Sequence, residues 1–487
     1  MVPLTITDRI RMPALAVAPA VLDTLKAAFT YPNKKRASMM HLMRGKPWLW
    51  KSMPEFEVSW GAEVVNAEAT ITFPRGGIGK IRKALEDAGL EWDELDNRLL
   101  VPHLHNYRTN VALWTHQREA VDACLEREQG ILRAGTGSGK TSSLLALAAE
   151  AEQTCLVIMN SAALQEQWKE RAMTELGLAE DDIGVLGGGS KKVRPFTLGI
   201  VNSVVRKMDD VGFRREWGMV LCDEVHMAAS TMFQKCVDRF PAWYRIGASA
   251  DQRRKDGREF LIHDAFGDVV HDAKREDLIL AGKVLDVEVY AHETNEEADW
   301  YGMPTEENPT RRVDFMALVD QLSGSAERNA LALRIVADEV AKGEQVILFV
   351  HRREHAERLL RMISELGIRG GLMLGGATSS DEFERTLVGM RAGNMQVGIG
   401  TYQAVGASID IPRLAVGVAV TPCGANRQMF GQARGRVCRA PDGKMTARLH
   451  VLWDSRIFTT HLKNILSWNG HAHVKRDGDW ERLKNRG

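Results

Sequence analysis

The stretch Ala134-Gly135-Thr136-Gly137-Ser138-Gly139-Lys140-Thr141 lies between a short apolar run over 131–134 and a predicted helix over 142–149. A strand, a glycine-rich loop and a helix in this order form the context that a phosphate-binding loop requires. Glycines let the backbone wrap closely around phosphate oxygens, and a helix N-terminus adds a favourable potential for an anion. The strict motif begins with glycine, where this chain has Ala134. The stretch predicts a nucleotide site in an α/β domain.

The backbone and two side chains of this loop are expected to bind ATP. Backbone N–H groups point inward at the phosphate oxygens. Lys140 is expected to hold the β- and γ-phosphates, and the Thr141 hydroxyl is expected to bind Mg²⁺. The predicted ATP ligands in the loop are therefore Gly135, Gly137, Ser138, Gly139, Lys140 and Thr141.

An acidic pair follows another apolar run, 219–222, in the sequence Asp223-Glu224-Val225-His226. Mg²⁺ is held by a carboxylate at the carboxyl end of a neighbouring parallel strand. Asp223 is therefore expected to bind Mg²⁺, directly or through water, and Glu224 to orient and deprotonate the attacking water. Alone, such a pair is most often a solvated strand end; the upstream phosphate loop favours the catalytic interpretation.

Short apolar runs alternate with helical stretches over 109–285 and again over 323–469, which indicates two parallel sheets covered by helices on both faces. Residues 1–108 form a separate small α+β module with expected strands over 55–60 and 68–73 and a helix after 78. We expect a linker with some structure over 286–322 and a polar, basic tail over 470–487. The expected strands of the two large sheets are 131–134, 156–159, 198–201, 219–222, 244–247, 346–350, 397–400, 416–420 and 449–453.

The composition limits the class of protein. The 487 residues allow about three domains. Lys plus Arg and Asp plus Glu number 64 each, so a nucleic-acid surface must be a local patch. The six cysteines form no CxxC pair and are expected to be buried thiols. A secretory signal and a membrane-spanning run are not evident, which favours the cytoplasm.

An arginine-rich stretch in the second α/β half reads Gln432-Ala433-Arg434-Gly435-Arg436-Val437-Cys438-Arg439. Arg436 and Arg439 share one face of a helical turn because they are three residues apart. Guanidinium groups suit phosphate recognition and can stabilise the charge that develops on a transferring phosphoryl group. By itself the pattern is also compatible with a solvated basic face or with contacts to nucleic-acid phosphates.

The order of these motifs resembles superfamily 2 helicases, closest to the XPB-like and phage-encoded DNA helicase branch, over about residues 110–460. The resemblance implies two tandem RecA-like domains that hydrolyse ATP between them and so move on or unwind DNA. It also implies that Arg436 and Arg439 act as arginine fingers beside Gln432, that Gln117 reads adenine, and that Asp410 contacts ATP. Gly247-Ala248-Ser249-Ala250-Asp251 resembles the coupling motif, with Asp251 where the family has Thr.

The resemblance further places Leu164, Gln167 and Trp168 at a strand-contacting motif, and Ser203 and Thr401 at two others. Basic clusters add candidate nucleic-acid contacts at Lys191, Lys192 and Arg253. In the N-terminal module the candidates are Lys34, Lys35, Arg36, Arg75, Lys80, Arg82, Lys83, Trp48, Trp50 and Trp60, each of which is also compatible with a solvated face or a core. Phosphate contacts carry affinity without sequence information, so we expect DNA binding with little sequence preference that weakens as salt rises.

Several functions remain open at this point. The expected pair of ATP-hydrolysing domains suits a DNA helicase that acts on single-stranded, duplex, forked or branched DNA. It also suits a duplex translocase or remodeller without net unwinding, and an RNA helicase. Replication, recombination or repair proteins are the partners that the resemblance suggests. A binding module without hydrolysis is disfavoured by the presence of Lys140, Asp223, Glu224 and Arg436, and a small-molecule kinase has no use for a second RecA-like half.

Overall fold

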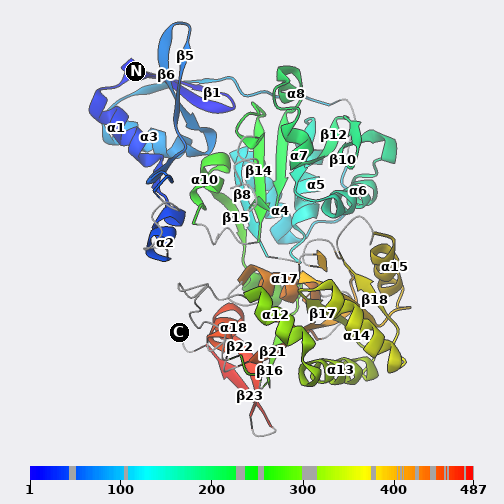
Figure 1. Ribbon diagram of the computed structural model, residues 1–487. Helices are drawn as coiled ribbons and strands as arrows, with labels where there is room; N and C mark the ends of the chain where they lie inside the picture. The colour runs from blue at the N-terminus through cyan, green and yellow to red at the C-terminus, as the bar shows by residue number, and fades with distance from the viewer. Residues whose placement is uncertain are drawn as a thin grey trace. The chain divides into compact units, whose positions relative to one another are not determined.

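The computed structural model describes residues 1–487 except for 43–50, 104–107, 136, 226–235, 251–256, 295, 299–314, 375–379, 403, 406–408, 410, 423–426, 439–445, 455–456, 458–459, 477–478 and 486–487. For residues 41, 42, 380, 427, 428, 432 and 476 only the backbone is described. The described chain forms two compact units (Figure 1). The first covers Met1–Gly135 and Gly139–Lys274, and the second covers Thr136–Ser138 and Arg275–Gly487.

A five-stranded sheet with the order β5-β6-β2-β1-β7 forms the N-terminal part of the first unit. Ile81 and Leu85 of α3 recur at helical spacing and pack with Leu25 of α1 against the apolar side chains of this sheet. The elements are β1 (Val2–Ile6), β2 (Arg9–Pro13), η1 (Ala14–Ala16), α1 (Pro19–Ala28), β3 (Thr30–Pro32), α2 (Lys34–Leu42), β4 (Phe56–Val58), β5 (Gly61–Val65), β6 (Glu68–Pro74), η3 (Arg75–Gly77), α3 (Ile78–Asp87) and β7 (Trp92–Asp96).

The rest of the first unit is built on an eight-stranded sheet with the order β11-β10-β12-β9-β13-β14-β8-β15. Every pairing in it is parallel except that of β10 with β11. The elements are α4 (Thr115–Arg127), β8 (Gln129–Ala134), α5 (Lys140–Glu150), β9 (Cys155–Met159), α6 (Ala162–Leu176), η4 (Glu180–Asp182), β10 (Ile183–Gly187), β11 (Ser190–Lys192), β12 (Phe196–Ile200), α7 (Val201–Val205), α8 (Val211–Arg215), β13 (Met219–Asp223), β14 (Tyr244–Ser249), α10 (Phe260–Phe266) and β15 (Val269–Ala273).

Two hydrophobic cores cover the two faces of this sheet. Helices α4, α5 and α6 pack on one face, where Trp168 is fully buried. Helices α7, α8 and α10 pack on the other face, where Trp217 is buried. Strands that are covered on both sides must be apolar throughout, which is why the sequence shows continuous apolar runs here.

The second unit contains another eight-stranded sheet, with the order β18-β19-β17-β20-β21-β16-β22-β23. Its pairings are parallel except for β22 with β23. The elements are α11 (Arg275–Leu280), β16 (Glu288–Thr294), α12 (Phe315–Gly324), α13 (Ala326–Ala341), β17 (Gln345–Val350), α14 (Arg353–Glu365), β18 (Gly370–Met373), α15 (Ser380–Arg391), β19 (Val397–Thr401), β20 (Leu414–Ala419), α17 (Arg427–Val437), β21 (Arg448–Asp454), α18 (His461–Asn469), β22 (His471–Arg476) and β23 (Asp479–Lys484). The expected α/β class with two RecA-like sheets is confirmed.

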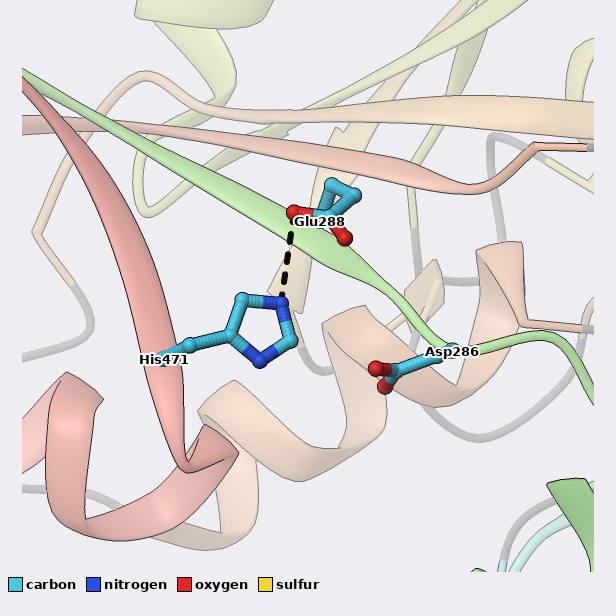
Figure 2. A group of neighbouring side chains, drawn as sticks. All are labelled: Asp286, Glu288 and His471. Atoms are coloured by element: carbon cyan, nitrogen blue, oxygen red, sulfur yellow. Dashed lines mark ion pairs between the residues drawn. The ribbon is translucent and has the colours of Figure 1, made fainter. Parts of the chain in front are cut away.

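Two segments differ from the sequence-based prediction. The expected linker over 286–322 contributes β16 to the second sheet, and the expected tail over 470–487 contributes β22 and β23. Strand β22 pairs in parallel with β16, and His471 at its start faces Glu288 (Figure 2). The second unit also begins at Arg275 rather than in the expected linker.

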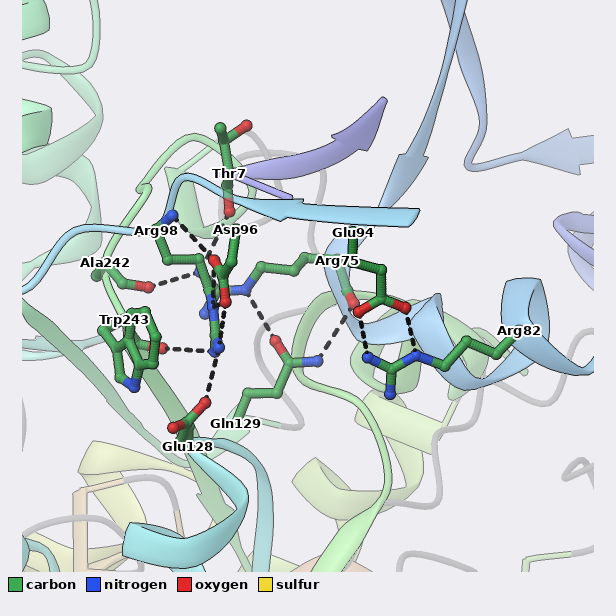
Figure 3. A network of polar contacts seen from close by, with 10 residues as sticks. All are labelled: Thr7, Arg75, Arg82, Glu94, Asp96, Arg98, Glu128, Gln129, Ala242 and Trp243. Atoms are coloured by element: carbon green, nitrogen blue, oxygen red, sulfur yellow. Dashed lines mark hydrogen bonds and ion pairs between the residues drawn. The ribbon is translucent and has the colours of Figure 1, made fainter. Parts of the chain in front are cut away.

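Buried polar groups join the N-terminal sheet to the first large sheet (Figure 3). The Arg75 side chain is 1% exposed, and its guanidinium donates to Oε1 of Gln129 at 2.8 Å and to the Ala242 carbonyl at 2.6 Å. Arg98 bonds to Glu128 at 2.7 Å and stacks over the Trp243 ring. These contacts fix the N-terminal sheet on its neighbour within the first unit.

A second set of contacts at this junction converges on Asp264 of α10. Its carboxylate, which is buried, accepts hydrogen bonds from Tyr31 at 2.8 Å, Ser59 at 2.6 Å and Lys80 at 2.9 Å. Gly76 packs against the α10 backbone so closely that an added Cβ would lie 2.3 Å from the His263 carbonyl oxygen. The junction therefore has no room for a side chain at this position.

The structure also bears on the cysteines and on membrane insertion. The five described cysteines are free and buried, as the sequence suggested, and Cys423 lies outside the described residues. In the described part of the chain, no helix is both long enough and apolar enough to cross a bilayer.

Candidate nucleotide-binding and hydrolysis site

The glycine-rich loop joins the end of β8 to the start of α5. Gly137 and Gly139 have φ angles of 89° and 79°, in the left-handed region that disfavours other residues. A Cβ added to Gly139 would also lie 2.0 Å from Nε2 of Gln117. The backbone conformation thus favours glycine at position 139, and any other residue there would also displace the Gln117 amide. Ala134, where the strict motif has glycine, is the last residue of β8 and is buried.

Gln117 of α4 lies against this loop. Its side chain is 4% exposed, its Oε1 accepts from the Trp114 backbone N–H at 2.8 Å, and its Nε2 donates to the Gly139 carbonyl at 3.4 Å. The first bond caps the N-terminus of α4. The structure therefore brings the expected adenine contact to the expected phosphate loop.

Lys140 and Thr141 open α5. The Lys140 ammonium reaches back across the loop and donates to the Ala134 carbonyl at 3.0 Å. Thr141 is half-buried, whereas Ser138 is 1% exposed. Strands β8 and β13 run parallel in one sheet, so Lys140 and Asp223 lie at the same edge of it.

Asp223 ends β13 in a buried position. Oδ2 accepts a hydrogen bond from the Trp168 indole at 2.9 Å, and Oδ1 accepts one from the Glu224 backbone N–H at 2.9 Å. Burial raises the pKa of Asp223, and the Glu224 charge raises it further, whereas Lys140 and the Trp168 bond lower it. A carboxylate whose charge is disfavoured by burial gains strongly from a nearby cation. The donor set of Asp223 and the Thr141 hydroxyl thus suits Mg²⁺, which prefers oxygen ligands.

Glu224 has a φ angle of 56°, which is uncommon for a residue with a side chain. Such a conformation costs about 1–3 kcal/mol and is found preferentially at active sites. The residue expected to act as the general base is therefore held in a strained backbone conformation directly after the buried Asp223.

In the second unit the expected finger residues lie on and after α17. Arg436 is half-buried and donates to the Ile409 carbonyl at 2.6 Å, which places it beside the chain segment that leads to position 410. Arg434 bonds to the Trp468 carbonyl at 2.9 Å and so packs within the second unit. Arg439, Asp410 and the Gln432 side chain lie outside the described residues.

The expected nucleic-acid contacts have different surroundings. Gln167, Ser203 and Thr401 are half-buried, and the Thr401 hydroxyl accepts from the Ala404 N–H at 3.2 Å. Lys191 is exposed on β11, whereas Lys192 pairs with Asp181 at 3.0 Å. Arg253, Trp48 and Trp50 lie outside the described residues.

Two expected nucleic-acid contacts are wrong. Trp168 is fully buried and binds Asp223, so it serves the acidic centre and cannot face a strand. Arg75 is buried at the junction described above. The role of Trp168 had no local sequence signal, because its partner lies 55 residues further along the chain.

Other candidates of the N-terminal module have partners within the protein. Lys80 pairs with Asp264 and Arg82 with Glu94. The Trp60 indole donates to Thr30 at 3.2 Å and packs on the core of the N-terminal sheet. These contacts weaken the prediction of a nucleic-acid surface there.

Comparisons with known proteins match both large sheets. The model of the type III restriction enzyme res subunit matches residues 110–253, and the helicase conserved C-terminal domain matches residues 327–441. The DNA 3'-5' helicase XPB of Kineococcus radiotolerans is 25% identical over 379 residues, which cover 76% of this chain and 65% of that protein. The DNA 3'-5' translocase XPB2 of Sulfurisphaera tokodaii is 25% identical over 370 residues, which cover 69% of this chain and 80% of that protein.

Among solved structures, Dbp5 of S. cerevisiae bound to RNA and ADP BeF3 has a TM-score of 0.52 and 15% sequence identity, and the likeness covers 74% of this chain and 89% of Dbp5. This likeness concerns the fold. The matched family segments fall on the two RecA-like sheets, and the first of them contains the glycine-rich loop and the acidic pair.

Proposed function

Because the chain is a superfamily 2 helicase of the XPB-like type, we propose that it uses the energy of ATP hydrolysis to move along DNA or to separate its strands. One observation carries this proposal. Asp223 is buried at the sheet edge, bonded to Trp168 and close enough to Lys140 for the lysine charge to lower its pKa. A carboxylate and an ammonium group placed together after two parallel strands are what a triphosphate with its metal ion requires.

We assign the binding of ATP to the first unit. The backbone N–H groups of Gly135, Gly137, Ser138 and Gly139 hold the phosphates. Lys140 neutralises the β- and γ-phosphates, and Gln117 contacts the adenine. Thr141 and Asp223 hold Mg²⁺, which supplies charge neutralisation at the phosphate oxygens.

Glu224 accepts a proton from the attacking water as it adds to the γ-phosphorus. The bond to the β-phosphate oxygen then breaks, and charge develops on the leaving group. Lys140 faces that charge. The strained backbone of Glu224 supports this role because a general base must be held in one orientation.

Arg436 and Arg439 are the proposed fingers that stabilise charge on the γ-phosphate, with Gln432 and Asp410 beside them. A planar guanidinium adds most when it meets charge that appears only in the transition state. ATP would thereby favour one arrangement of the two sheets, and product release would favour another.

The proposed DNA contacts are Gln167, Ser203, Thr401, Lys191, Lys192 and Arg253. Phosphate contacts of this kind give little sequence preference and a strong salt dependence. A duplex translocase without net unwinding is the second candidate, because one relative that this chain resembles is named as a translocase.

The proposal is tested by ATPase rates with single-stranded DNA, duplex DNA, forked DNA and RNA. We expect DNA to stimulate hydrolysis and RNA to stimulate it less. Lys140→Ala should lower kcat by about 100-fold or more. Lys463→Ala removes an exposed lysine of α18 and should have no effect. Full stimulation by RNA alone, or wild-type rates in Lys140→Ala, would overturn the proposal.

Unwinding and translocation are separated by two assays on the same preparation. A helicase releases the strand of a forked duplex, whereas a translocase displaces a third strand from a triplex without opening the duplex. Triplex displacement without fork unwinding would select the translocase.

A further inference from the structure

Three side chains that can bind a metal ion meet where β16 and β22 begin. Asp286 precedes β16, Glu288 is its first residue, and His471 is the first residue of β22. One ligand atom from each lies within 4.8 Å of the others, and Figure 2 shows the three side chains converging. The histidine lies 183 residues from Glu288 in sequence, so pairing of the strands alone brings them together.

The His471 ring indicates a missing ligand. Its side chain is 10% exposed, and its Nε2 atom is buried without a hydrogen bond to any part of the chain that the structure describes. Oε2 of Glu288 lies 3.3 Å from this atom. Two ligands of a tetrahedral Zn²⁺ at bond lengths near 2.1 Å are about 3.4 Å apart. The pair thus already has the separation of one edge of such a site.

Neighbouring groups orient the two carboxylates. Arg482 donates to Oε1 of Glu288 at 3.3 Å, so Oε2 is the oxygen that faces His471. Oδ1 of Asp286 accepts from Arg275 at 3.3 Å and from the Val287 backbone N–H at 3.0 Å, which leaves Oδ2 available. Partners that hold the ligands in this way are typical of metal sites.

The backbone around the group is also held. The Asn469 amide donates to the Val287 carbonyl at 3.1 Å and to the His471 carbonyl at 3.0 Å. This single side chain ties the start of β16 to the start of β22. The backbone that carries Glu288 and His471 is therefore held in place by hydrogen bonds. The Asp286 side chain is exposed.

We propose that Asp286, Glu288 and His471 bind a divalent transition-metal ion, for which Zn²⁺ is the best match. Imidazole combined with carboxylates suits zinc, whereas Mg²⁺ and Ca²⁺ prefer oxygen ligands alone. His473 lies beside this group, where its Nε2 atom bonds to Oε2 of Glu288. The ion links the hairpin β22–β23 to β16 and so closes the loop of the chain between Glu288 and His471.

The test uses the full chain, free of nucleotide and of any histidine tag, after removal of metal with EDTA. Calorimetric titration with Zn²⁺ should show one tight site that excess Mg²⁺ does not compete for. Co²⁺ should give the visible absorption of a tetrahedral site. Glu288→Gln and His471→Gln should each weaken Zn²⁺ binding by about tenfold or more.

Glu293→Gln is the matched control, because Glu293 is an exposed glutamate on the same strand. It should bind Zn²⁺ like the wild type. Asp286→Asn is the alternative variant should the others fail to fold, since Asp286 is exposed. Zn²⁺ should also raise the thermal unfolding midpoint of the wild type and of Glu293→Gln, but not that of Glu288→Gln or His471→Gln.

Equal Zn²⁺ affinity in Glu288→Gln and Glu293→Gln would overturn the proposal, as would the absence of tight Zn²⁺ binding by the folded wild type. The second result would assign the group to an ion-pair network with Arg275 and Arg482. Either outcome leaves the ATPase proposal intact, because the two sets of residues are separate.

Discussion

Replacing Trp168 with phenylalanine removes one N–H donor from the buried Asp223 carboxylate and keeps most of the ring. The bond is 2.9 Å long, and both partners are buried. A hydrogen bond to a charged acceptor contributes about 1.5–3 kcal/mol. Since 1.36 kcal/mol corresponds to a factor of ten, loss of this bond favours the protonated form of Asp223 by about tenfold or more. The Mg²⁺ concentration for half-maximal ATPase activity should therefore rise at the acidic pH values where protons compete with Mg²⁺ for this carboxylate.

The same change predicts a shift in pH dependence. The Trp168 bond lowers the pKa of Asp223, so its removal raises that pKa further. Asp223 must be ionised to hold Mg²⁺, and activity is lost as the pH falls through its pKa. The acidic limb of the kcat profile should therefore move to higher pH in Trp168→Phe, most clearly at limiting Mg²⁺.

Trp217→Phe is the matched control. Trp217 is 1% exposed on the opposite face of the same sheet, and its indole nitrogen has no hydrogen-bond partner in the described structure. Both variants lose packing, but only Trp168→Phe loses a bond to Asp223. The reasoning is refuted if the two variants show the same acidic limb and the same Mg²⁺ requirement.

Gly139→Ala should raise the KM for ATP by about tenfold or more. The left-handed backbone at position 139 costs an alanine about 1–2 kcal/mol, and the added Cβ displaces Gln117. An unchanged KM in steady-state ATPase assays would show that the loop tolerates the side chain. Glu224→Gln should bind ATP and DNA but hydrolyse ATP at least about 100-fold more slowly; filter binding with rapid-quench hydrolysis measures both, and rapid turnover would remove Glu224 as the base. Arg75→Met should lower the free energy of unfolding by about 2–5 kcal/mol, since buried acceptors lose their donor. Arg82→Met removes an exposed ion pair worth under about 1 kcal/mol and is its control in urea unfolding; equal losses would contradict a structural role for Arg75.

Local sequence was sufficient for the features that depend on local pattern. The glycine-rich loop and the strand before Asp223 were predicted because a covered parallel strand must be apolar and the phosphate loop is one continuous stretch. The nine expected strands of the two large sheets are confirmed, with ends that move by a residue or two.

Features that depend on contacts between distant segments could not be predicted. Strands β16, β22 and β23 carry histidines and charged residues, so their composition resembled a linker and a tail, and only the pairing of β16 with β22 makes them part of the sheet. Trp168 and Arg75 were misassigned for the same reason. Each matches a nucleic-acid contact by residue type, whereas its burial depends on a partner elsewhere in the fold.

The junction centred on Asp264 and Arg75 offers a place to attach a reporter. Leu15 of η1, which follows β2 of the N-terminal sheet, is 96% exposed, and the described native cysteines are buried. A thiol-reactive dye on Leu15→Cys therefore labels the part of the first unit that these contacts hold against the large sheet. A second dye on the exposed Val388 of α15 marks the other unit. Under the proposed function, a change in energy transfer between the two dyes on addition of ATP would report the proposed change in the arrangement of the two units.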